Sequence, residues 1–175
     1  FGEVANKVVT RWNEGDLTWT LDADGTLTIS GTGAMKVYST DDSPAYNNSN
    51  IKKVVIEDGV TSIGSFAFWS CTSLTSIEIP SSVTSIGQGA FFGCSSLTDI
   101  TIPESVTSIG NSAFYECTSL TSITIPGSVT SIGNCTFLNC SGLTSITIPG
   151  GITIIGYYAF SGTPWLTSKQ NENPL

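Results

Sequence analysis

The chain has 175 residues, a formal net charge of −8 and no histidine. The acidic excess disfavours nucleic acid and anionic membrane surfaces as partners, because both are bound through clustered lysine and arginine. Without histidine, Ser-His-Asp and Cys-His catalysis and most zinc sites are removed, and no apolar stretch approaches the roughly 20 residues of a membrane-spanning helix. We therefore expect no enzyme activity, catalytic residue, cofactor, metal site or membrane insertion.

Residues 1–50 are predicted to form an N-terminal β cap and a connecting loop. The segment LTWTLDADGTLTIS (17–30) has two alternating runs around DADG, which predicts a β-hairpin with Gly25 at positive φ. Residues 39–50 are predicted to be a polar loop. The open end of a repeat stack must be covered, and the side chains expected to cover it are Trp12, Trp19, Leu27 and Ile29.

From residue 51 to residue 165, a unit of 23 residues repeats five times without insertion or deletion, as in LTSIEIPSSVTSIGQGAFFGCSS (74–96). Proline, glycine and phenylalanine recur at fixed points, the phenylalanines at Phe68, Phe91, Phe114, Phe137 and Phe160. A fixed period in this range predicts a solenoid, in which each unit buries its apolar face against its neighbours. A protein built in this way presents a long, regular surface.

Each unit divides into three segments, as residues 120–142 illustrate. The segment LTSITIP predicts a strand with apolar side chains inward, ended by a proline that has no N–H to donate. The next segment predicts a short strand or an extended turn, and Gly133 predicts a sharp bend after it. The last segment predicts one helical or 3-10 turn that buries Phe137 and Cys140.

After residue 165 the pattern fails at Lys169, where an inward isoleucine is expected. A lysine at a core position indicates that the stack stops locally. Residues 166–175 are therefore interpreted as the start of a C-terminal cap or as a truncated next repeat.

Four of the five cysteines, Cys71, Cys94, Cys117 and Cys140, hold the same position in consecutive units. Stacked rungs lie about 5 Å apart, which is within disulfide reach. Each cysteine follows its phenylalanine by three residues and so lies on the same inward face. A buried column of free thiols and a set of disulfides therefore both remain possible, and the first is favoured. Cys135 lies off this column and is expected to be more exposed.

Two surfaces are candidate binding sites. The first is the concave face, made by the outward positions of the predicted strands: Lys53, Val55, Ser76, Glu78, Asp99, Thr101, Ser122, Thr124, Ser145 and Thr147. It suits an extended ligand laid across the strands, and its alternative role is solubility. The second is an aromatic stripe that follows each phenylalanine, formed by Trp69, Phe92, Tyr115 and Leu138. It suits protein or glycan contact, and its alternative role is packing between repeats.

The unit L-x-x-I-x-I-P-x-x-V-x-x-I-G-x-x-A-F-x-x-C-x-x resembles the BspA-like leucine-rich repeat across residues 51–165. The segment DGTLTISGTGAM (24–35) is also similar to the region that precedes such repeats in secreted bacterial proteins. The resemblance implies a right-handed, curved, mainly β solenoid with a parallel concave sheet and short 3-10 or helical turns. It also implies bacterial surface proteins, some of which are adhesins for matrix proteins such as fibronectin and fibrinogen.

The expected function is thus a non-enzymatic binding or adhesion module, extracellular or attached to the cell surface. Its expected partners are host or microbial surface proteins of the matrix-protein type, or glycans. The alternative is a structural spacer that presents other domains of a longer surface protein. The adhesin role comes from the resemblance alone, because no binding motif of the family can be placed on these residues.

Overall fold

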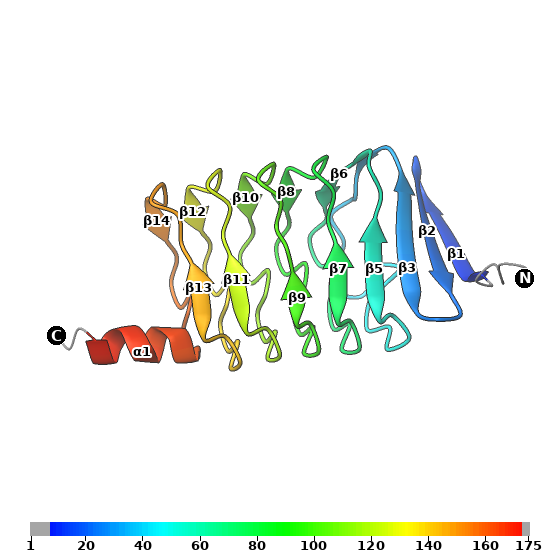
Figure 1. The fold of residues 1–175 in the computed structure, drawn as a ribbon. Helices are drawn as coiled ribbons and strands as arrows, with labels where there is room; N and C mark the ends of the chain where they lie inside the picture. The colour runs from blue at the N-terminus through cyan, green and yellow to red at the C-terminus, as the bar shows by residue number, and fades with distance from the viewer. Residues whose placement is uncertain (1–7, 173–175) are drawn as a thin grey trace, which may run out of the picture.

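The computed structural model describes residues 8–172, which wind as a solenoid with successive 23-residue units stacked in register (Figure 1). Residues 1–7 of the predicted cap and residues 173–175 of the predicted C-terminal segment lie outside the described residues. Parallel pairing joins positions 23 residues apart, such as Ser76 with Asp99 and Ser122 with Ser145. The mainly β solenoid predicted from the repeat is confirmed.

Each turn supplies one strand to each of two parallel ladders. The first sheet has the order β1-β2-β3-β5-β7-β9 and continues, after an interruption, as β11-β13; the second has the order β4-β6-β8-β10 and continues as β12-β14. The second ladder shows that the middle segment of each unit is a short strand, one of the two alternatives that the sequence left open. The strands are β1 (Val8–Glu14), β2 (Leu17–Asp22), β3 (Thr26–Gly31), β4 (Gly33–Ala34), β5 (Lys53–Ile56), β6 (Val60–Ile63), β7 (Ser76–Glu78), β8 (Ser85–Ile86), β9 (Asp99–Ile100), β10 (Ser108–Ile109), β11 (Ser122–Thr124), β12 (Ser131–Ile132), β13 (Ser145–Thr147) and β14 (Ile154–Ile155).

The N-terminal strands cover the first end of the stack. β2 and β3 form the predicted hairpin, with Gly25 at a φ of 87° in its turn. β1 adds a further antiparallel strand that the sequence did not predict, and β3 pairs parallel with β5 to begin the solenoid ladder. Trp19 on β2 is fully buried, and its ring lies 5.9 Å from that of Phe68, while Trp12 on β1 is half-buried.

Residues 39–50, expected to form a polar loop, also contribute to the stack. Ala45 is fully buried, and its carbonyl accepts a hydrogen bond from Cys71 Sγ at 3.0 Å. Phe68 has the same role one turn later, where its carbonyl accepts from Cys94 Sγ at 3.1 Å. Ala45 therefore takes the place of a phenylalanine in a turn whose sequence lacks the repeat pattern.

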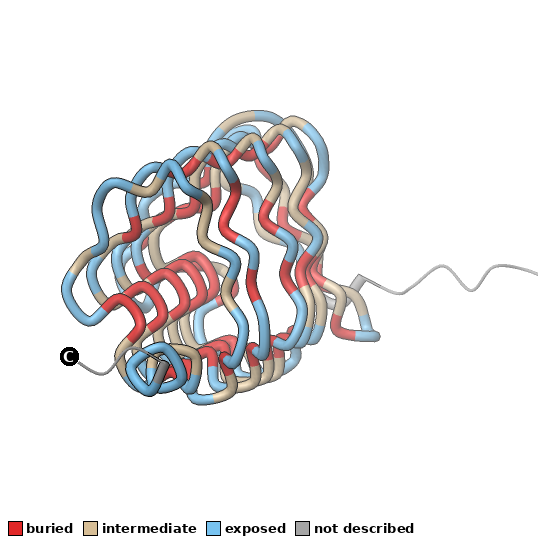
Figure 2. The backbone as a smooth tube through the Cα atoms, turned by 60° about the vertical axis from the view of Figure 1, so that its left-hand side comes forward, coloured by how far each residue is buried: buried red, intermediate tan, exposed pale blue. Residues whose placement is uncertain are grey.

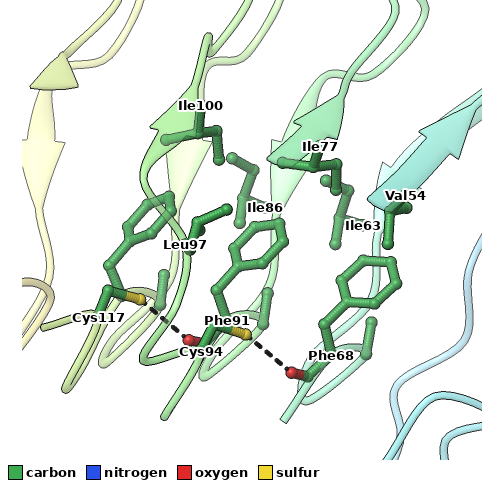
Figure 3. Packing of buried hydrophobic residues seen from close by; sticks show 14 of the residues in the cluster. Val54, Ile63, Phe68, Ile77, Ile86, Phe91, Cys94, Leu97, Ile100 and Cys117 are labelled. Atoms are coloured by element: carbon green, nitrogen blue, oxygen red, sulfur yellow. Dashed lines mark hydrogen bonds between the residues drawn. The ribbon is translucent and has the colours of Figure 1, made fainter. Parts of the chain in front are cut away.

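A column of phenylalanine rings runs along the core. Consecutive rings from Phe68 to Phe160 have centroids 5.3 to 5.7 Å apart and lie nearly parallel. Trp19 covers the first ring, and Trp165 covers the last at 4.9 Å. Figure 2 shows the buried positions as parallel rows along the stack, and Figure 3 shows Phe68 and Phe91 below Ile63 and Ile86. Each buried phenylalanine contributes about 1.5–3 kcal/mol relative to exposure.

The repeated glycine serves close packing. The bend predicted after Gly133 is present as a turn over residues 134–139, but it does not use the conformational freedom of the glycine. Gly133 and its equivalents do not have positive φ. A Cβ on Gly110 would overlap the backbone of Gln88 in the preceding turn, so the side chain is excluded by the neighbouring unit. The first positive φ value after the glycine lies two residues further on, at Phe66, Gly89, Ser112, Cys135 and Tyr158. A second follows four residues later, at Ser70, Gly93, Glu116, Asn139 and Gly162.

The described chain ends in helix α1 (Pro164–Glu172). Thr163 caps it, because its hydroxyl accepts a hydrogen bond from the Leu166 N–H at 3.2 Å, and Pro164 takes the first helical position. Lys169 is exposed on this helix. In the last turn Ile155 is 55% exposed, whereas Ile132 at the same position one turn earlier is 2% exposed.

Replacing Gly110 by alanine tests the close packing of turns. Gly110→Ala should lower the free energy of unfolding by about 1–3 kcal/mol, because the backbone of Gln88 must move. The matched control is Gly150→Ala, where no atom lies within 4 Å of the added Cβ, and its effect should stay below about 0.5 kcal/mol. Urea unfolding followed by tryptophan fluorescence measures both. Equal effects would show that the turns are not in close contact at this glycine.

Candidate functional site

The ten outward positions of the first sheet form a continuous surface, which we call the strand face. They point outward because the residues that alternate with them, such as Val54, Ile77 and Ile100, are buried. The parallel register sets equivalent side chains side by side, as for Thr124 and Thr147. Lys53, Val55 and Ser76 are half-buried and the other seven positions, from Glu78 to Thr147, are exposed.

The charge of the strand face is concentrated near β9. Lys53 Nζ lies 2.5 Å from Glu78 Oε1, so these two charges largely compensate each other. A further ion pair joins Lys36, which follows β4, to Glu14 on β1. Asp99 belongs to neither pair and is exposed. The strand face therefore carries an uncompensated carboxylate at its centre.

A groove of about 580 Å³ lies on the strand face where the first sheet is interrupted between β9 and β11. Asp99 and Thr101 line it on one side of the interruption, and Ser122, Thr124, Ser145 and Thr147 line it on the other. A smaller groove of about 310 Å³ beside it is lined by residues that include Glu78 and Asp99. Neither groove is lined by a lysine or an arginine, so both favour neutral or cationic groups.

The aromatic stripe is half-buried along its whole length. The ring centroids of Trp69 and Phe92 lie 4.6 Å apart, and those of Phe92 and Tyr115 lie 4.4 Å apart with an interplanar angle of 3°. Leu138 continues the row and is also half-buried. The rings thus pack between repeats and still reach the surface, so the stripe remains a predicted contact surface.

Two features of these surfaces could not be predicted from the sequence. Phe66 lies 5.1 Å from Trp69 and extends the stripe, but other units carry Gly, Ser, Cys or Tyr at its position, so no column pointed to it. The groove at β9 follows from an interruption between units that look alike. Its only sequence signal is the acidic pair Asp99 and Glu104, which this unit has in place of the small residues Ser122 and Gly127 of the next.

The predicted cysteine column is present and buried. Each of the four thiols donates to a backbone carbonyl of the preceding turn, for example Cys94 to Phe68 at 3.1 Å and Cys117 to Phe91 at 3.2 Å (Figure 3). All four are free thiols, and Cys135 is half-buried outside the column. Burial raises the pKa of Cys71 and Cys140 to about 12, and it raises the pKa of Cys94 and Cys117 well above the usual value.

The described residues contain few other groups that could form a metal or reactive site. Residues 8–172 contain no group of three or more His, Cys, Asp or Glu side chains that could hold a metal ion. Burial and the Glu14 carboxylate raise the pKa of Tyr38, whose hydroxyl donates to Glu14 in the N-terminal strands. None of the helices in residues 8–172 has the length and apolar character needed to cross a membrane.

Residues 42–167 match the family model described as "BspA type Leucine rich repeat region", in six copies. Among solved structures, a leucine-rich cell surface protein of Faecalibacterium prausnitzii is 36% identical, with a TM-score of 0.65 over 90% of this chain and 47% of that one. A leucine-rich repeat protein of Eubacterium ventriosum is 25% identical, with a TM-score of 0.51 over 88% of this chain and 63% of that one. A leucine-rich repeat protein of T. pallidum shares the fold at 23% identity, with a TM-score of 0.58 over 95% and 97% of the two chains.

This chain therefore spans 47% of the length of the F. prausnitzii protein. No curated protein sequence matches it.

Alkylation of the native protein tests the thiol column. Iodoacetamide should modify Cys135 and leave the four column cysteines unmodified even at pH 9, because the reactive form is the thiolate. All five should react in urea, and mass spectrometry after digestion gives the extent at each site. Since the column pKa values are raised on folding, the stability that they contribute is complete below the ordinary value of 9.0 and is lost as the pH rises toward 12. Rapid native modification of Cys94 or Cys117 would contradict the buried column.

Proposed function

This chain belongs to the BspA-type leucine-rich repeat family, and we propose that it is a non-enzymatic binding module, which acts outside the cell or at its surface and recognises proteins through the strand face. The proposal rests on the structure of the strand face. Its exposed positions are short hydroxyl side chains and carboxylates held in register by a parallel sheet, with a groove at the centre. Such a rigid polar surface can pair with an extended partner at little cost in side-chain entropy.

The surface location has separate support. The F. prausnitzii protein, 36% identical over 90% of this chain, is described as a leucine-rich cell surface protein. The chain also has only 11% charged residues, with Ser, Thr and Gly abundant. This composition is more common in extracellular β modules than in cytosolic enzymes, which carry about a quarter charged residues.

Proteins are favoured over glycans by the geometry of the aromatic stripe. A sugar ring packs its C–H groups against the open face of an aromatic ring. The rings of Trp69, Phe92 and Tyr115 cover one another's faces at 4.4 and 4.6 Å, and they present mainly their edges to the surface. Ring edges suit the irregular apolar side chains of a protein partner at the rim of an interface.

Binding to a panel of immobilised matrix proteins, including fibronectin and fibrinogen, and to a glycan array tests the proposal. The double variant Thr101→Arg/Thr124→Arg places bulky side chains on the exposed strand face and should weaken the binding of any captured protein by at least about tenfold. The matched control is Ser108→Arg/Ser131→Arg, which changes exposed positions of the second sheet and should leave binding unchanged.

If no protein in the panel binds, or if both double variants bind like the parent, the strand face is not the recognition surface. A spacer that presents other domains is then the better interpretation.

A further inference from the structure

The last turn of the stack exposes large apolar side chains at positions that are polar in the earlier turns. Ile154 on β14 is 63% exposed, and Tyr157, which follows this strand, is 81% exposed. Every earlier unit has serine at the position of Ile154, and Ser, Gln or Asn at the position of Tyr157. The terminal units of a solenoid normally have a polar outer face, so this change indicates a surface that is covered by a partner.

β14 is also an unpaired edge of the second sheet. In the inner turns a carbonyl of this sheet accepts from the next turn: the Gly156 N–H donates to Ile132 at 2.8 Å, and the Gly110 N–H donates to Ile86 at 2.9 Å. The equivalent carbonyl of the last turn is that of Ile155, and within residues 8–172 no strand follows β14 to pair with it. Since the N–H and the C=O of one strand residue point to the same edge, Ile155 presents a donor and an acceptor there. Such an edge is a template for another strand.

Helix α1 leaves this edge uncovered. Trp165 on the helix lies against the ring of Phe160 at 4.9 Å, so the helix covers the phenylalanine side of the last turn. Figure 1 shows α1 on the opposite side of this end of the stack from β14, with the helix axis running along the stack. A partner can therefore approach β14 without displacing the helix.

The charge of the chain lies away from this end of the stack. Residues 117–168 contain no Asp, Glu, Lys or Arg. In residues 169–175 the charges of Lys169 and Glu172 sum to zero, so the whole net charge of −8 belongs to residues 1–116. Two copies that meet through their last turns therefore keep their acidic regions far apart, and their mutual repulsion is small.

We propose that two copies of this chain associate through their last turns, where β14 of one copy forms an antiparallel pair with β14 of the other. Ile155 lies opposite its counterpart, and the two residues exchange both N–H···O bonds, as in a hydrogen-bonded antiparallel pair. Such a contact is isologous, because the same edge is used on both copies about a two-fold axis. Each copy covers Ile154 and Tyr157 of the other. Because α1 lies away from this axis, the copies are offset and the two helices do not meet.

The inference goes beyond the proposed function, because it concerns a second copy of the chain and a surface other than the strand face. The dimer has two strand faces. A partner with repeated binding sites can then be held at two points, which raises the overall affinity without any new contact on the strand face.

Sedimentation equilibrium of the 175-residue protein, at concentrations up to about 0.5 mM, tests the association because dimer formation depends on concentration. The average mass should rise with concentration from 18.3 kDa toward twice that value. Ile155→Glu should require at least about tenfold higher concentration to dimerise, because like charges then face each other across the two-fold axis. The matched control is Ser108→Glu, at an exposed position inside the same sheet, which should dimerise like the parent.

A mixture of Ile155→Glu and Ile155→Lys tests the two-fold pairing itself. Neither variant alone should dimerise as the parent does, whereas the equimolar mixture should, because opposite charges then lie across the axis. Recovery in the mixture also shows that both variants are folded. Amide hydrogen exchange of Ile155 should slow as the concentration of the parent protein rises, while that of Ile132 should not change.

If the protein keeps a mass of 18.3 kDa at the highest concentration, or if Ile155→Glu associates as the parent does, β14 does not join two copies. An equimolar mixture that stays monomeric, or an association that leaves the Ile155 amide unprotected, would equally overturn the inference. The proposed function is tested separately, because the variant Thr101→Arg/Thr124→Arg should lose binding and still dimerise.

Discussion

The structure depends on the direct stacking of one phenylalanine column. Each buried phenylalanine contacts the ring of the next turn, and its N–H donates to the next turn at 2.7 to 2.9 Å, from Phe68 to Ala90 and on to Phe137 with Ala159. These contacts allow one register, in which residues 23 positions apart become neighbours. A shift of one residue would separate the rings and also break the backbone bonds beside them.

Because the register is common to the whole stack, it organises features that have no role in the core. The strand face, the aromatic stripe and the thiol column are each a row of side chains that lie 23 residues apart in sequence, as the phenylalanines do. The interruption between β9 and β11 shows which of these contacts hold the stack together. Both ladders are interrupted there, but the phenylalanine side retains its stacking and its hydrogen bonds. The corner between the two sheets also stays joined, because the Ser128 hydroxyl donates to the Val106 carbonyl. The phenylalanine column therefore continues through the whole stack, whereas the two sheets do not.

The features that repeat could be predicted from the sequence, whereas most features that occur once, apart from the hairpin of β2 and β3, could not. The burial of Phe114 and Cys117 and the outward direction of Thr124 followed from the period alone. The buried position of Ala45 was not predicted, because its turn has the backbone of a repeat but lacks the side chains of the repeat pattern. Backbone geometry alone leaves little signal in the sequence. The glycine positions were found, but the reason for them was not: their contacts are with the preceding unit, so no local rule describes them. The interruption between β9 and β11 lies between two units of similar sequence, so no single unit encodes it.

The most direct measurement is the thermal and urea unfolding of two deletion proteins. One lacks residues 97–119, which is a whole unit, and the other lacks residues 97–118. In the first, Phe91 meets Phe137 in the original register, so the protein should remain folded and unfold cooperatively at a somewhat lower urea concentration, since stability in such stacks adds up from units and their interfaces. The second has an offset of one residue after the junction and should lose its cooperative transition. If the two proteins unfold alike, the stacking in register does not govern this fold.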